Sequence, residues 1–189
     1  YYNTDYNGQL FGCYVNNDLE HNLPGIEFSV DNDYIWEEPN DHFLHHELIK
    51  LPDGNYLGLI EEIRLGPIPF GPWTTLFQAL GYQANGFASE FPWVGDKIVV
   101  WDKDTKDIIW EWSTFDYYSM SDYDTISDIW FQAATLGRYD WTHSNALDYD
   151  WASNSNSIEK IYLSARHLSR ISKIDYNMKD IDWNIGLEM

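Results

Sequence analysis

The sequence is poor in cysteine and in basic residues. Cys13 is the single cysteine, which excludes an internal disulfide framework and a structural zinc site built on cysteines. Only 11 lysines and arginines stand against 31 acidic residues, for a formal charge of −20. So few basic groups cannot neutralise a row of phosphates. We therefore expect no nucleic acid and no anionic membrane among the partners.

Long apolar runs and an amino-terminal leader are also missing. No run approaches the roughly 18 apolar residues of a membrane helix, so a membrane span is not expected. The sequence begins YYNTDYNG, with neither an initiator Met nor a basic and then apolar leader. It is therefore expected to be either a mature product or a piece of a longer chain, and the internal repeats favour the piece.

Three segments have the pattern of β-hairpins. In each, apolar arms rich in β-branched and aromatic residues flank a polar turn. The segments are 44–63 around PDGN, 96–112 around DKDTKD and 170–186 around YNMKD. Helical patterns are weak, and only 73–80 and 126–136 fit a short helix. The sequence thus predicts an all-β protein.

The second and third hairpins are copies of each other. At one offset of 73 residues, Asp102 aligns with Asp175 and Trp110 with Trp183. An earlier, weaker copy contains Trp36, and the opening YYNTDYNGQLFG fits the end of one more. The stretches that begin at His45 and His143 align as another hairpin within each repeat. Four strands per repeat predict the blades of a β-propeller.

The number of repeats determines the expected organisation. With this period, 189 residues make about two and a half blades, fewer than the about 4 to 8 that close a ring. We therefore predict that residues 1–189 form one partial β-propeller with no internal linker. The alternative is a short open array capped by dimerisation, in which a second copy of the chain is a partner.

Four tryptophans lie at repeated hairpin positions, and we predict that they pack between blades instead of stacking on sugars. They are Trp101, Trp110, Trp112 and Trp183. The acidic turn at Asp102 lacks the glycine and the distal glutamate of a calcium loop. No metal and no cofactor are predicted.

Polar residues at the start of the first strand of each repeat are the candidate site. In a propeller this strand lines the central channel, so side chains of neighbouring blades converge there. His45 and His46 begin one such strand, His143 and Asn145 begin another, and Arg166 ends the strand paired with it. Because residues two apart on a strand share a face, His143 and Asn145 are expected to point the same way. Imidazoles, an amide and a guanidinium suit a tetrahedral oxyanion.

Three further residues stand next to this set. Trp141 is a candidate for the border of a substrate pocket beside His143. Asp140 either orients a histidine or ends a loop. His167, next to Arg166, is interpreted as structural.

These residues lie in motifs that resemble the bacterial arylsulfotransferases, which use no nucleotide sulfate donor. The resemblance runs from about Trp36 to Gly186, and DWTHSN followed by SARH is its most specific part. It implies a six-bladed propeller, periplasmic or extracellular, that moves a sulfuryl group from a phenolic sulfate ester to a phenol. The family does so through a sulfated histidine. The small phenolic donor and acceptor are therefore the expected partners.

The family pattern also implies roles for individual residues. Matching motifs assigns the sulfuryl-binding groups to His143, Asn145, Arg166 and one of His45 and His46. The nucleophilic histidine of the family comes from a later blade, and His167 lies in the wrong motif to replace it. We therefore expect the chain to be inactive alone. The alternative is a non-catalytic propeller that binds carbohydrate or protein.

Overall fold

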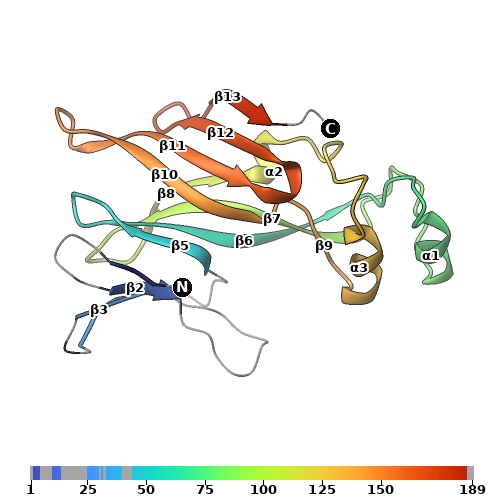
Figure 1. Cartoon of the computed structure of the whole chain (residues 1–189), viewed down its shortest axis with the longest axis horizontal. Helices are drawn as coiled ribbons and strands as arrows, with labels where there is room; N and C mark the ends of the chain where they lie inside the picture. The colour runs from blue at the N-terminus through green and yellow to red at the C-terminus, as the bar shows by residue number, and fades with distance from the viewer. Residues whose placement is uncertain are drawn as a thin grey trace.

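Three sheets follow one another along the chain and lie side by side (Figure 1). The computed structural model describes residues 2–4, 10–13, 25–29, 31, 33–39 and 44–186. Each sheet is built on four consecutive antiparallel strands. The predicted all-β fold of four-stranded, blade-like repeats is confirmed.

The first two sheets contain the strands β1 to β9. The first sheet has short strands in the order β1 (Tyr2–Thr4), β2 (Leu10–Cys13), β3 (Gly25–Phe28) and β4 (Tyr34–Glu37). The second has β5 (Leu44–Lys50), β6 (Tyr56–Gly66), β7 (Phe91–Trp101) and β8 (Ile108–Ser113). The short β9 (Tyr139–Asp140) pairs in parallel with β7.

The third sheet and the helices complete the described chain. The sheet has β10 (Ser144–Ala152), β11 (Ser157–Ala165), β12 (Arg170–Asp175) and β13 (Ile181–Gly186). The helices are α1 (Thr74–Ala79), α2 (Thr114–Tyr117), α3 (Ile129–Leu136) and the 3-10 turn η1 (Arg166–Leu168). The two predicted helices correspond to α1 and α3, whereas α2 was not predicted.

The number of sheets differs from the predicted two and a half. The first sheet occupies only residues 2–37, because its strands are three or four residues long. A whole sheet therefore fits before His45. Residues 2–4 and 10–13 form β1 and β2, the first two strands of this sheet, so the assignment of this opening stretch to the end of another copy was wrong. Asn7 and Gly8 lie outside the described residues.

The repeat found in the sequence is visible in two turns of the same build. Asp102 lies before β8 and Asp175 at the corresponding place before β13. The Oδ1 atom of each accepts hydrogen bonds from the backbone N–H groups of the residues two and three positions later. Lys106 and Lys179 then take left-handed φ values of 65° and 63°. The same side-chain acceptor and the same backbone turn recur after one period, so the repeat is structural.

Tryptophans join the second sheet to the third. The Trp110 indole stacks on Tyr176 with ring centroids 4.7 Å apart, and its Nε1–H donates to the Tyr176 carbonyl. Trp112 Nε1–H donates to the Lys179 carbonyl at 3.0 Å. Packing between sheets is thus confirmed for both. Trp183 is 39% exposed on β13 and lies beside Tyr162 of its own sheet, with ring centroids 6.1 Å apart, so packing between sheets stays a prediction for Trp183.

Aromatic packing also joins the first sheet to the second. Trp36 of β4 stacks on Tyr56 of β6 at 3.9 Å, and its ring lies 5.9 Å from that of Trp101 on β7. The Glu27 carboxylate of β3 is buried there and binds Lys50 and the Tyr56 hydroxyl. Trp101 therefore packs between sheets, as predicted.

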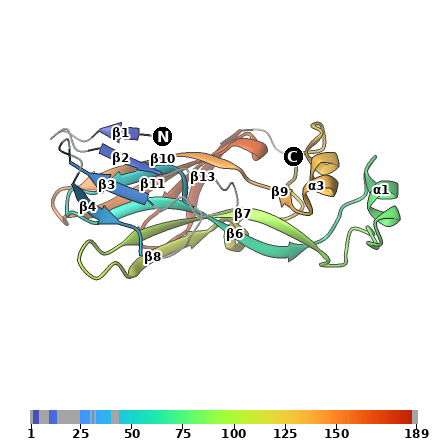
Figure 2. The same ribbon diagram turned by 90° about the horizontal axis from the view of Figure 1, so that it is seen from below.

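The helices α1 and α3 lie together beyond one end of the sheets (Figures 1 and 2). An aromatic cluster fixes them there, since Trp130 of α3 stacks on Tyr139 at 3.8 Å and on Trp73 at 5.4 Å. In the part of the chain that the structure describes, no helix has the length and apolar character needed to cross a bilayer. This end of the molecule carries the candidate site.

Candidate functional site

His143 stands between β9 and β10 in an unusual backbone conformation. Its φ is 42°, in the left-handed region that side chains other than glycine seldom occupy. A register shift follows at once, between Ser144 and Ala146. The residues on both sides of His143 are bound to one carboxylate, because Asp96 Oδ2 accepts the Thr142 hydroxyl and the Ser144 N–H. The buried Asp96 of β7 thereby holds His143 out of the regular ladder.

His46 repeats this conformation on the neighbouring sheet. Its φ is 62°, and β5 has a register shift between Leu44 and Leu48. The rings of His46 and His143 lie 5.7 Å apart, edge to face. His45 instead pairs with Asp96, with 2.9 Å between Nε2 and Oδ1. By backbone conformation His46, and not His45 as the alignment assumed, corresponds to His143.

Asp140 and Arg166 each contact one of the two nitrogens of the His143 ring. Nδ1–H donates to Asp140 Oδ2 at 2.6 Å, which fixes the orientation of the imidazole. On the other side Arg166 Nη1 lies 3.3 Å from Nε2. Of the two readings of Asp140, the structure supports orientation of a histidine. The guanidinium of Arg166, at the start of η1, reaches His143 as the sequence predicted.

His167 packs directly on this group. Its ring stacks on that of His143 with centroids 4.6 Å apart, and its Nδ1–H donates to the Asp140 carbonyl at 2.8 Å. These contacts agree with a structural interpretation. They also place His167 at the surface of the pocket, which its sequence motif did not indicate.

The histidines differ in their affinity for protons. The hydrogen bond to Asp140 raises the pKa of His143, against the opposing effects of burial and of Arg166. Burial lowers the pKa of His46, and the neighbouring His45 and His143 lower it further. Near neutral pH, His143 is therefore the more readily protonated of the two.

Asp96 stays charged in spite of its surroundings. Burial works against its charge, but the hydrogen bonds from His45, Ser144 and Thr142 hold its pKa below the usual value. The buried Asp96 carboxylate thus binds His45, the neighbour of His46, and also Thr142 and Ser144, the neighbours of His143.

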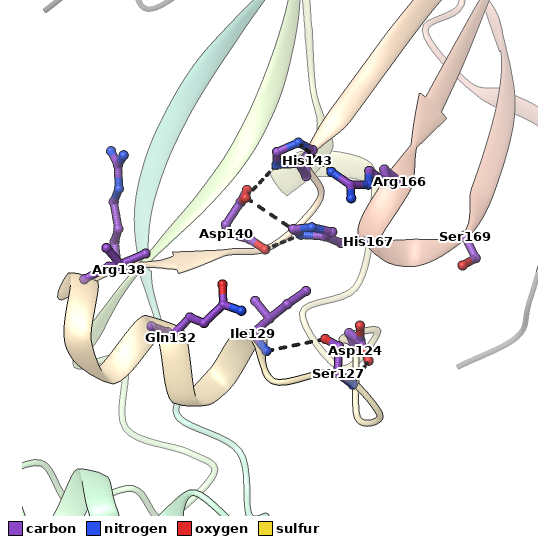
Figure 3. Close-up of a pocket in the computed structure, with 12 residues that line it drawn as sticks. Asp124, Ser127, Ile129, Gln132, Arg138, Asp140, His143, Arg166, His167 and Ser169 are labelled. Atoms are coloured by element: carbon purple, nitrogen blue, oxygen red, sulfur yellow. Dashed lines mark hydrogen bonds and ion pairs between the residues drawn. The ribbon is translucent and has the colours of Figure 1, made fainter. Parts of the chain in front are cut away.

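A pocket of about 500 Å³ opens beside these side chains (Figure 3). Asp140, His143, Arg166 and His167 line one side of it. Residues of α3 line the other, and Ile129 and Gln132 extend toward the first side. The pocket therefore has Asp140, Arg166 and the histidines on one side and α3 on the other, with Asp124 and Arg138 near the two ends of the helix.

Asp140, His143 and His167 also have potential ligand atoms within 4.8 Å of one another. Asp140 already accepts hydrogen bonds from Nδ1 of both histidines, through its carboxylate and its carbonyl. The cluster is therefore explained as a hydrogen-bond network. The prediction that no metal binds stays a prediction.

Two predicted site residues do not take the expected places. Trp141 is fully buried, packs against Trp93 and Phe115, and donates its Nε1–H to the Asp122 carbonyl. It belongs to the core, so its assignment to a substrate pocket is corrected. Asn145 is half-buried at the bulge that opens β10 and is not among the residues that line the pocket. The bulge interrupts the alternation on which its shared face with His143 was based.

Asp96 was missed by reasoning from the sequence. It lies in Gly95-Asp96-Lys97 at the start of a hairpin arm, where an aspartate is ordinarily solvated. Nothing local marks it as buried, because its partners come from β5 and from the entry to β10. The repeat alignment was the only sequence signal for site residues, and it selected the histidines at the starts of the strands and not Asp96.

Comparison with known families points to one of them. The family model described as Arylsulfotransferase (ASST) matches residues 76–189, more than half of the chain. The matched range contains His143, Asn145 and Arg166, whereas His45 and His46 precede it. No curated protein matches the chain.

Proposed function

Since this chain belongs to the arylsulfotransferase family, we propose that the protein transfers a sulfuryl group from a phenolic sulfate ester to a phenol through a sulfohistidine intermediate. The observation that carries the assignment is the approach of Arg166 Nη1 to His143 Nε2, at 3.3 Å, beside the His46 ring. We place this activity in the periplasm or outside the cell, as the family resemblance implies.

The charges of this group favour an oxyanion. Arg166 is permanently cationic, and the hydrogen bond to Asp140 favours a proton on His143. Protonation adds an N–H on Nε2 that faces the guanidinium with a like charge. An anion bound between them accepts hydrogen bonds from both, so sulfuryl oxygens relieve the repulsion. His46, whose pKa burial lowers, supplies a neutral imidazole next to them.

The proposed transfer proceeds in two half-reactions. In the first, the ester S–O bond breaks while an S–N bond forms on the nucleophilic histidine. The departing phenoxide takes a proton from His143, and Arg166 stabilises charge on the sulfuryl oxygens. In the second, an acceptor phenol gives its proton to His143 and attacks the sulfur, and the S–N bond breaks, which restores the free nucleophilic histidine and the proton on His143.

The nucleophile is not assigned to these residues. The corresponding histidine of the family belongs to a motif that this sequence does not match. Asp96 and Asp140 hold His45, His143 and His167 by hydrogen bonds. The proposal therefore gives the described residues the roles of binding, orientation and proton transfer.

Sulfuryl transfer can be distinguished from hydrolysis by its need for an acceptor. The full-length protein is incubated with 4-nitrophenyl sulfate, and nitrophenol release is followed with and without a second phenol. We expect release beyond a single turnover only when the second phenol is present. Equal turnover without it would indicate a sulfatase, and no release under either condition would leave the non-catalytic binding propeller as the better description.

A further inference from the structure

One face of α3 forms the pocket wall opposite His143 and Arg166. The residues of α3 that line the pocket are Ile129, Gln132, Ala133 and Leu136. Their spacing of three, four and seven positions places them on a single side of a helix. Three of the four are apolar, so this wall differs in kind from the ionisable wall that it faces.

The helix cannot turn this face elsewhere without breaking its packing. Trp130, on another side of α3, is fully buried and stacks on Tyr139 at 3.8 Å. Gly137 ends the helix with φ 72°, and its N–H donates to the Ala133 carbonyl at 2.8 Å. The chain then enters β9 and reaches Asp140. The α3 wall and the Asp140 and His143 part of the facing wall therefore belong to one short segment, 129–143, whereas Arg166 and His167 come from η1.

The apolar wall is open to a ligand. Leu136 is 67% exposed although it lines the pocket, and Ile129 is partly exposed. A single exposed leucine is ordinary, but this one lines the same pocket as a guanidinium and a histidine. Ligand pockets of this size combine apolar contact area with a few polar groups that fix orientation. The complementary ligand has an anionic head and a flat apolar body.

The length of the wall limits the shape of that body. Positions 129 and 136 are two helical turns apart, about 10 Å at a rise of about 1.5 Å per residue. A single phenyl ring covers only part of this length, whereas two fused rings cover more of it. The Gln132 amide lies between the two ends and can bind a polar substituent on the ring.

We propose that the α3 face binds the aryl group of the substrate and that it favours sulfate esters of fused two-ring phenols over those of single-ring phenols. This inference depends on the proposed function only for the sulfate end of the ligand. The α3 face then determines which phenols the protein uses, and Arg166 and His143 bind the group that all its donors share.

The test compares two donors in the full-length protein. The donors are 4-methylumbelliferyl sulfate, with two fused rings, and 4-nitrophenyl sulfate, with one. Leu136→Asp replaces the exposed apolar contact with a charge. We expect kcat/KM for the two-ring donor to fall about tenfold, the lower limit for one lost contact in an apolar pocket. For the one-ring donor we expect a clearly smaller change.

Leu80→Asp is the matched control. Leu80 is also an exposed leucine at the carboxyl end of a helix, α1, but it does not line the pocket. Its substitution should leave the ratio of the two kcat/KM values unchanged. An unchanged ratio in Leu136→Asp, with wild-type activity present, would overturn the inference while leaving the proposed function intact.

A binding measurement separates the two proposals. The affinity for 4-methylumbelliferyl sulfate, followed by its fluorescence, should fall in Leu136→Asp and not in Leu80→Asp. This result without turnover in the wild type would support the aryl wall and reject the transferase. If the wild type neither binds nor uses either donor, both proposals are wrong.

Discussion

Two histidine–aspartate pairs lie near each other in this protein but in different surroundings. In the pair of His45 and Asp96, the side chains are 13% and 3% exposed. In the pair of His143 and Asp140, they are 30% and 42% exposed. The atoms in contact are of the same kinds, with separations of 2.9 and 2.6 Å. What differs is access to solvent and to ligands.

The difference separates support from chemistry. Asp96 spends both carboxylate oxygens on protein donors, which tie β5, β7 and the entry to β10 together. Asp140 binds Nδ1 of His143, whose other ring nitrogen, Nε2, lies next to Arg166 at the pocket. A buried pair fixes the backbone, whereas a half-exposed pair can exchange protons with a substrate. This contrast can be tested on each side.

The largest effect on activity is expected from substitution of Arg166, the cationic residue next to the half-exposed pair of His143 and Asp140. Arg166→Ala removes a charged donor from the sulfuryl oxygens and should lower kcat about 10²- to 10³-fold. Arg166→Lys should recover part of this loss, because it keeps the charge but not the planar fork. The measurement is steady-state nitrophenol release in the presence of an acceptor phenol.

Arg64→Ala is the control for charge alone. Arg64 is half-exposed and pairs with Glu62 and Asp116, away from the pocket. Its kcat should match that of the wild type. Wild-type turnover in Arg166→Ala would contradict the assignment of Arg166 to sulfuryl binding.

The buried pair is expected to dominate stability. Asp96→Ala leaves the Thr142 hydroxyl, the Ser144 N–H and His45 without their acceptor, and should cost about 3 kcal/mol of unfolding free energy. Asp140→Ala, at an exposed pair, should cost less than about 1 kcal/mol. Urea denaturation at neutral pH measures both.

The stabilising effect of Asp96 should also depend on pH. Its folded pKa is lowered, so its contribution is present above the unfolded value, about 3.9, and is lost as pH falls through the folded value. The gap between wild type and Asp96→Ala should therefore narrow on acidification. If Asp140→Ala proves the more destabilising of the two, the division into support and chemistry is wrong.

The smallest effect is expected in the pH profile of Asp140→Asn. The amide oxygen still accepts the His143 Nδ1–H, so the ring keeps its place, but the charge that raises the pKa of His143 is gone. Because the proton of His143 serves the leaving phenoxide, the alkaline limit of kcat should move to lower pH. An alkaline limit that does not move would show that His143 is not the acid.

The repeats could be predicted from the sequence because their turns depend on hydrogen bonds between residues close together in the chain. Asp102 and Asp175 close the same turn with their own neighbours, so the motif can be recognised without any distant partner. Trp110 was correctly placed between sheets because its repeat position marked it. The first sheet was undercounted, because only its last strand, with Trp36, showed the repeat and its strands are three or four residues long.

The site was predictable only in part. His143 lies in DWTHSN and Arg166 in SARH. The paired strands β10 and β11 bring these two motifs side by side, so the two residues are close in space. Trp141 was misplaced because an aromatic next to a polar site can face either the pocket or the core. Its burial depends on Trp93 and Phe115, which come from other segments.

The sequence by itself determined the class of fold, the repeat and the residues able to hold an oxyanion, because these follow from spacing and side-chain chemistry. The tertiary structure alone decided that His46 and not His45 adjoins His143, that Asp96 is buried against His45, Thr142 and Ser144, and that α3 faces His143 and Arg166 across a pocket. The physical reason is that left-handed backbone at His46 and His143, each with a register shift within or beside it, breaks the strand alternation. Burial is moreover set by partners far apart in the chain.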